Sequence, residues 1–126
     1  MSVYLDYNAS TPIDPRVLDV MIEVYRNEPG NADSRTHDYG GQTRKVTENA
    51  RKQVAELLGV TPEEVFYTSG STESNNIAIQ GLRDYAALTG KKHIITTSIE
   101  HKSVLNTVRY MESQGFEVDY VSPDIS

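Results

Sequence analysis

The chain has 126 residues, enough for one domain, and its 37% hydrophobic, 8% aromatic and 24% charged residues are typical of a folded α/β protein. A net charge of −6 with scattered lysines and arginines excludes a nucleic-acid-binding surface, and no apolar run reaches the roughly 18 residues of a membrane span. With no cysteine, the chain has no disulfide, thiolate zinc site or thiol nucleophile. No export signal precedes the first element, so we expect a cytoplasmic protein.

The first half of the chain is expected to contain one extended segment and two helices. Val3–Tyr7 is a short strand or an extended segment. Asp14 followed by Pro15 predicts a helix start, because aspartate caps helices and proline suits the first helical position. A second helix is predicted from about Thr43 to Leu58, with Gly59 in the position that ends helices.

Strands and helices alternate in the second half. Thr61–Glu64 is a capping box that leads into a strand-like run, and later helices stop at Gly90 and Gly115. Three strands are predicted, at 65–68, 94–97 and 116–120. Three strands with two crossover helices make a βαβαβ unit, so the pattern predicts a layered α/β fold.

Thr68–Asn76 is the most informative segment, since it lies where a predicted strand ends and a helix begins. A helix N-terminus carries unpaired N–H groups and a partial positive charge. Gly70 lets the backbone approach a ligand, and Ser69, Ser71 and Thr72 add hydroxyl donors, which together predict a phosphate site. The same residues are also typical of a simple helix cap and turn. The segment matches neither a Walker loop nor a dinucleotide fingerprint.

Four segments, in the same order, resemble the NifS/IscS-type cysteine desulfurases of the class V aminotransferases. They are Tyr4–Pro12, Gly30–Asn31 with Ser34 and His37, Thr68–Asn76, and Ile94–His101. The resemblance implies a partial large domain of the fold type I transferases that use pyridoxal phosphate (aspartate aminotransferase-like), with helices on both faces of a layered sheet. It also implies that residues 1–14 belong to the small domain and 15–126 to an incomplete cofactor-binding domain.

The resemblance also assigns roles to individual residues. Ser71 and Thr72, beside Gly70, match the residues that bind the cofactor's phosphate. His101 matches the histidine that stacks on the pyridine ring and is proposed to move protons, although a lone histidine at this place is more often a helix cap or a surface residue. The 30–34 loop is left out of the site, because Ala32 stands where the family usually has proline.

Several groups that the family needs are expected beyond Ser126. These are the lysine that anchors the cofactor, an aspartate on the pyridine nitrogen, an arginine for the substrate carboxylate and a sulfur-accepting cysteine. Lys102, beside His101, is interpreted as a solvated residue of the first helical turn, because the glycine-rich context of the family's anchoring lysine is absent here. The chain alone is therefore predicted to be inactive.

The resemblance implies conversion of L-cysteine to L-alanine and enzyme-bound sulfane sulfur, with pyridoxal phosphate as the electron sink. It implies a homodimer and a sulfur-acceptor or scaffold protein as partners, with neither membrane nor direct nucleic-acid binding. The sulfur's destination is left open among iron–sulfur clusters, tRNA thiolation and DNA phosphorothioation. The alternatives are another class V enzyme (a selenocysteine lyase or a kynureninase-like enzyme) and a non-catalytic phosphate- or phosphosugar-binding module.

Overall fold

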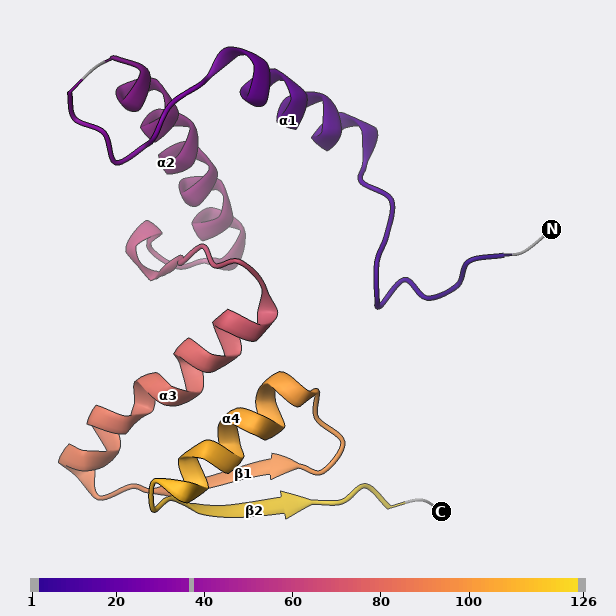
Figure 1. The fold of residues 1–126 in the computed structure, drawn as a ribbon, viewed down its shortest axis with the longest axis vertical. Helices are drawn as coiled ribbons and strands as arrows, with labels where there is room; N and C mark the ends of the chain where they lie inside the picture. The colour runs from indigo at the N-terminus through magenta and orange to yellow at the C-terminus, as the bar shows by residue number, and fades with distance from the viewer. Residues whose placement is uncertain (1–2, 37, 125–126) are drawn as a thin grey trace. The chain divides into compact units, whose positions relative to one another are not determined.

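The computed structural model describes residues 3–36 and 38–124 and divides the chain into two compact units, Met1–Val65 and Phe66–Ser126 (Figure 1). His37, one residue of the second resembling segment, lies outside the described residues. The predicted boundary between residues 14 and 15, which separates a small from a large domain, stays a prediction.

Helix α1, Pro15–Asn27, begins where the sequence predicts. The Asp14 carboxylate accepts a hydrogen bond from the Arg16 backbone N–H at 2.9 Å, and Pro15 occupies the first helical position. The Arg16 guanidinium, 2.8 Å from the same carboxylate, is the main cause that lowers the pKa of Asp14. The predicted apolar residues of this helix are exposed, most of all Tyr25 at 83%.

Helix α2, Asp38–Leu58, begins about one turn before the predicted start near Thr43. Gly40 and Gly41 lie in this first turn, and glycine weakens the sequence signal for a helix. Gly40 is buried, and a Cβ there would stand 2.4 Å from the Ser34 carbonyl oxygen. Gly30 faces it from the loop, since a Cβ there would stand 2.6 Å from the Tyr39 carbonyl oxygen. Glycine at both positions therefore lets the loop pack directly on the start of α2, which is a tertiary effect that periodicity does not report.

The predicted capping box is confirmed, whereas the predicted strand at 65–68 is wrong. Pro62–Glu64 forms the short 3-10 helix η1, and the Glu64 carboxylate accepts from the Thr61 backbone N–H at 2.8 Å and hydroxyl at 3.0 Å. The Val65 carbonyl accepts from the Arg51 guanidinium instead of a neighbouring strand. A strand needs a paired neighbour, and 65–68 has none in the described part of the chain.

The second unit contains one βαβ crossover preceded by a helix. Its elements are α3 (Ser71–Thr89), β1 (His93–Thr97), α4 (Lys102–Ser113) and β2 (Glu117–Val121). The two strands run parallel, with His93 opposite Glu117 and Thr97 opposite Val121. The expected βαβαβ unit is thus two strands rather than three among the described residues, because its first strand does not form.

The core of this unit lies between the two helices. Ala86 of α3 and Val108 and Met111 of α4 are at most 1% exposed. Helix α4 contacts β2 and runs alongside the strands, and α3 packs on α4 (Figure 1). The apolar side chains predicted for the α4 stripe are buried or half-buried, whereas Ile77, Leu82, Tyr85 and Leu88 of α3 are more than half exposed.

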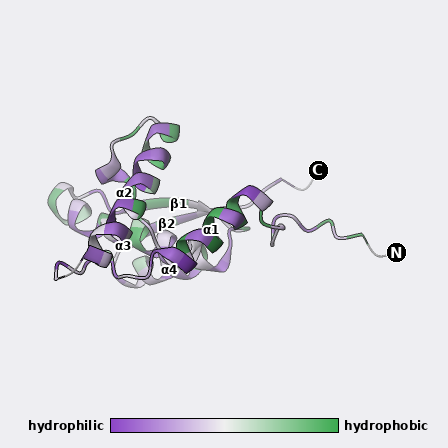
Figure 2. Cartoon of the chain, turned by 90° about the horizontal axis from the view of Figure 1, so that it is seen from above, coloured by the Kyte–Doolittle hydropathy of each residue, from purple (hydrophilic) through white to green (hydrophobic). Residues whose placement is uncertain are grey.

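The helices contain both hydrophobic and hydrophilic residues along their length (Figure 2). Coloured by hydropathy, each helix alternates hydrophobic and hydrophilic stretches along its length (Figure 2). Among the residues that the structure describes, no helix is both long and apolar enough to span a membrane.

Candidate functional site

The N-terminus of α3 is open. Gly70 is its N-cap, with an extended backbone (φ 161°) and no side chain to accept a hydrogen bond. The first-turn N–H groups, those of Ser71 and Thr72 included, have no acceptor within the helix. A Cβ on Gly70 would meet nothing within 4 Å. Neither the backbone conformation nor the packing of the described residues therefore requires glycine here, and the absence of a side chain leaves space beside the helix end.

Not every hydroxyl of the predicted phosphate loop is available. The Ser69 backbone N–H and hydroxyl both donate to the Glu73 carboxylate, at 2.6 and 2.8 Å, and these bonds lower the pKa of Glu73. The Thr68 hydroxyl lies 2.7 Å from that of Ser74. The hydroxyls of Ser71 and Thr72 have no hydrogen-bond partner within the described residues, and their role in phosphate binding stays a prediction, whereas the Ser69 hydroxyl is already engaged by Glu73.

His101 lies just beyond the C-terminal end of β1 and is the N-cap of α4. Its Nδ1 accepts from the Ser103 backbone N–H at 3.1 Å and lies 2.8 Å from the Ser103 hydroxyl. The capping role that the local sequence pattern favours is therefore confirmed. A neutral imidazole that accepts at Nδ1 carries its proton at Nε2, which assigns the tautomer.

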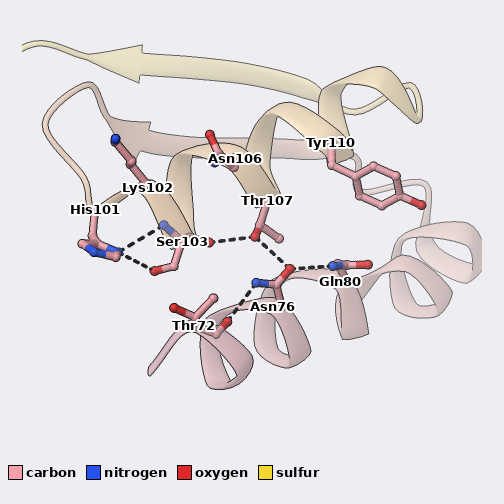
Figure 3. Close-up of a pocket in the computed structure, with 9 residues that line it drawn as sticks. All are labelled: Thr72, Asn76, Gln80, His101, Lys102, Ser103, Asn106, Thr107 and Tyr110. Atoms are coloured by element: carbon pink, nitrogen blue, oxygen red, sulfur yellow. Dashed lines mark hydrogen bonds between the residues drawn. The ribbon is translucent and has the colours of Figure 1, made fainter. Parts of the chain in front are cut away.

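Thr72 and His101 line one groove between α3 and α4 (Figure 3). Its volume is about 460 Å³, within the range of small-molecule sites. The other lining residues are Asn76, Gln80, Lys102, Ser103, Asn106, Thr107 and Tyr110. The structure thus brings together the predicted phosphate residue Thr72 and the predicted ring residue His101, while Gly70 and Ser71 stand at the helix end and do not line the groove.

A polar network that the sequence analysis did not identify joins the two helices across this groove. The Asn76 side chain donates to the Thr72 carbonyl at 2.8 Å and accepts from Gln80 at 2.9 Å. The Thr107 hydroxyl donates to the Ser103 carbonyl at 2.7 Å and lies 3.0 Å from Asn76 Oδ1. Threonine and asparagine in helix interiors suggest such back-bonds, but only the packing of α3 on α4 specifies the pairs.

The described residues fit two parts of pyridoxal phosphate. The open end of α3 suits a phosphate dianion, since unpaired N–H groups and the helix dipole favour negative charge. His101 offers a flat ring at the adjoining groove. Lys102 also lines the groove, but it is exposed and its amine points away from Thr72 (Figure 3), as expected for a solvated first-turn residue. Lys91 and Lys92 precede β1, at the opposite end of the strand from His101.

Known proteins match this chain over nearly its whole length. The family model described as aminotransferase class V matches residues 3–125. The cysteine desulfurase IscS of Stutzerimonas stutzeri is 52% identical over 98% of this chain and 31% of its own length. The mitochondrial cysteine desulfurase of Drosophila melanogaster is 51% identical over 94% of this chain and 26% of its own length.

Solved structures agree with these sequence matches. A NifS-like protein superposes with a TM-score of 0.86 and 45% identity, over 96% of this chain and 33% of that one. SspA in complex with cysteine gives a TM-score of 0.84 and 41% identity, over 98% of this chain and 35% of that one. The chain therefore spans about a third of the length of the relatives that it matches.

These findings define an α/β chain with the fold of the pyridoxal-phosphate-dependent transferases, as the sequence predicted. The chain belongs to the class V aminotransferase family. The relatives described above include two cysteine desulfurases and a NifS-like protein, and the matches do not favour a selenocysteine lyase, a kynureninase-like enzyme or a phosphosugar-binding module.

Proposed function

We propose that this chain is the cofactor-phosphate-binding portion of a cysteine desulfurase. The observation that carries the proposal is the convergence of Thr72 and His101 on one groove beside the open end of α3. Identity of about 50% to cysteine desulfurases over nearly the whole chain supports the same reaction. In that reaction L-cysteine and an enzyme thiol give L-alanine and an enzyme persulfide. The C–S bond breaks, the sulfur joins the thiol sulfur and a proton replaces it on carbon.

Each proposed site residue has a distinct task. The first-turn N–H groups of α3 and the hydroxyls of Ser71 and Thr72 bind the phosphate, and Gly70 leaves room for it. His101 lies against the ring and holds a proton at Nε2. Pyridoxal phosphate, when bound, supplies the electron sink for cleavage of the C–S bond. The structure contributes the positions of these side chains on two helix termini, where backbone hydrogen bonds restrict their movement.

The wider assignments follow from the relatives. SspA is described in complex with cysteine, which supports L-cysteine as the substrate here. We propose a homodimer with a sulfur-acceptor or scaffold partner, and iron–sulfur cluster assembly as the first pathway to test. A cytoplasmic location is proposed for a bacterial host, because the mitochondrial and mitosomal names belong to eukaryotic relatives.

The test is activity of a protein that spans the full length of these relatives, called the full-length protein below. With pyridoxal phosphate it should convert L-cysteine to L-alanine in a one-to-one ratio with sulfide released by a reductant. Alanine formation without sulfide, or turnover of kynurenine or selenocysteine in preference to cysteine, would contradict the proposal.

The chain of 126 residues makes a complementary prediction. Mixed with pyridoxal phosphate it should stay colourless after desalting, because the family's covalent anchor is expected outside it. Absorption spectra before and after borohydride treatment decide this. A yellow chain that loses its colour in Lys102→Ala would assign the anchor to Lys102 and overturn our interpretation of that lysine.

A further inference from the structure

Two residues outside the predicted site form a hydrogen-bond chain that leads to the His101 ring. Asn75 and Ser103 come from different helices, 28 positions apart in sequence, and the Asn75 side-chain amide donates to the Ser103 hydroxyl oxygen at 2.9 Å. Ser103 is only 7% exposed, and Asn75 is half-buried. The contact therefore has a fixed geometry with little competition from water.

The direction of the Asn75–Ser103 hydrogen bond favours one direction for the hydrogen bond between Ser103 and His101. Because Asn75 donates to the Ser103 oxygen, the Ser103 hydroxyl proton is free to point at His101 Nδ1, which lies 2.8 Å away. The Ser103 backbone N–H points at the same nitrogen from 3.1 Å. The backbone N–H is a fixed donor to Nδ1, so a protonated Nδ1 would lose that hydrogen bond and would force the Ser103 hydroxyl proton to turn to another acceptor.

We propose that Asn75 and Ser103 are positioning residues that hold His101 as the tautomer with its proton at Nε2, so that His101 meets the substrate as a proton donor. This proposal rests on the proposed function for its catalytic meaning, but the tautomer itself does not. The basic lone pair at Nδ1 is engaged by the helix cap. Proton abstraction from the substrate then needs a different base, for which the cofactor-anchoring lysine is the chemical candidate.

The test reverses the hydrogen bond without changing its shape. Asn75→Asp replaces the amide donor with an acceptor of the same size, so the Ser103 hydroxyl turns to donate to the carboxylate and offers its lone pairs to His101. The neutral ring then gains by placing its proton on Nδ1. The ratio of Nε2–H to Nδ1–H forms should fall at least about fivefold, the change expected from one exchanged hydrogen bond.

Nitrogen NMR measures this ratio directly. The chain has three histidines, so a sample labelled with ¹⁵N-histidine gives a simple spectrum, and His101→Asn identifies the signals of interest. At about pH 8 an ordinary histidine is neutral, which leaves the tautomer as the variable. In the unmodified chain His101 should show an unprotonated Nδ1 and a protonated Nε2. Averaged or inverted nitrogen signals there would overturn the proposal.

Two further variants separate the effect of the Asn75–Ser103–His101 hydrogen-bond chain, called the relay below, from an effect of charge. Asn75→Asp combined with Ser103→Ala lacks the hydroxyl that transmits the reversal, so the Nε2–H form should return. Asn106→Asp adds the same charge on the groove-lining surface of α4, where its side chain faces Arg109, and should leave the ratio unchanged. If the double variant kept the inverted ratio, or if Asn106→Asp reproduced it, the relay would be refuted.

Activity of the full-length protein distinguishes the two proposals. An inverted ratio in Asn75→Asp, with alanine production lowered at least about tenfold and recovered in the double variant, supports both. An inverted ratio in a protein that never produces alanine from cysteine refutes the proposed function and leaves the relay standing. Normal production by a variant with inverted tautomer refutes the donor role of His101 and leaves the desulfurase proposal standing.

Discussion

Helices α1 and α3 solve the same problem at their N-termini in opposite ways. At α1 the Asp14 carboxylate accepts from the first turn and is itself held by Arg16, so the positive end of the helix is already neutralised. At α3 the cap is Gly70, which has no side chain to accept from the first-turn N–H groups. The Asp14 cap stabilises α1 without any ligand, whereas the Gly70 cap leaves the first-turn donors of α3 available for an external anion.

Helix α4 lies between these two cases. Its cap is the His101 ring, which satisfies one first-turn N–H through Nδ1 and leaves Nε2 without a hydrogen-bond partner among the described residues. A cap that is also a titratable ring can serve structure and chemistry at the same time. Under the proposed function, the three helix starts therefore differ in what they bind: no ligand at α1, a proton partner at α4 and an anion at α3.

The largest expected effect separates the two roles of His101. His101→Asn keeps a good helix-capping oxygen but cannot transfer a proton near neutral pH. In the full-length protein we expect turnover of cysteine to fall by roughly 10²–10⁴-fold, the usual size of a general acid–base contribution. The melting temperature should change little. Steady-state alanine production and a thermal melt measure both quantities.

His93→Asn is the matched control for this variant. His93 pairs with Asp119 across the two strands at 2.9 Å, at the end of β1 opposite to His101. Its loss should leave turnover within about twofold, since it does not line the groove with Thr72 and His101. Equal losses in both variants would mean that His101 matters only for the fold of the second unit.

The second prediction concerns a substitution that gives α3 an aspartate N-cap like that of α1. Gly70→Asp has room for its side chain, because a Cβ there meets nothing within 4 Å, and the carboxylate caps the first turn. The affinity for pyridoxal phosphate should fall by at least about 100-fold, since the new carboxylate occupies the donors and repels the phosphate. The affinity for pyridoxal, which lacks the phosphate, should change less than about threefold.

Gly81→Asp provides the control on the same helix. A Cβ at Gly81 also meets nothing within 4 Å, and the substitution adds the same charge away from the helix start. Fluorescence titration of each variant with both cofactor forms gives the comparison. If Gly81→Asp weakened pyridoxal phosphate as much as Gly70→Asp did, the effect would be one of net charge and the open cap would have no special role.

A smaller effect is expected for Thr72→Ala, which removes one hydroxyl and leaves the helix start open. A charge-assisted hydrogen bond to a phosphate oxygen contributes roughly 1.5–3 kcal/mol, so binding of pyridoxal phosphate should weaken by about one to two decades. Binding of phosphate-free pyridoxal should be nearly unaffected. If both forms lost affinity equally, Thr72 would act only through the structure of α3.

Local signals in the sequence predicted the parts of this molecule that depend on near neighbours. The Asp14–Pro15 start, the Thr61–Glu64 box and the end of α2 at Gly59 form as expected, because each depends on residues within one helical turn. The strand at 65–68 fails because a strand depends on a partner from elsewhere. The early start of α2 does not follow from periodicity for a similar reason, since Gly40 is held by contact with Asn31 and Ser34 in the preceding loop.

The candidate site divides along the same line. Gly70, Ser71 and Thr72 are recognisable in sequence because a phosphate loop is one contiguous segment. The engagement of Ser69 by Glu73 is also local, four residues apart, and was overlooked because serine was counted as a free donor. Asn75 and Ser103 could not be paired from sequence, since nothing but the packing of α3 on α4 brings them within 2.9 Å.

The smallest predicted effect concerns Glu73, the acidic residue at the open end of α3. A free carboxylate in the first turn would compete with a phosphate, but the Ser69 backbone N–H and hydroxyl hold this one to the loop. These bonds lower its pKa below the ordinary value of 4.5, so they stabilise the loop above that pH and are lost as the pH falls through the lowered pKa. The Ser69 amide chemical shift should therefore titrate with a midpoint below 4.5, and the transition should be absent in Glu73→Gln.

Glu64, whose pKa is lowered by the backbone N–H and hydroxyl of Thr61, gives the internal standard, since its transition should survive in Glu73→Gln. A Ser69 midpoint above 4.5 would mean that Glu73 is not held by Ser69 and faces the phosphate site, where it should weaken cofactor binding.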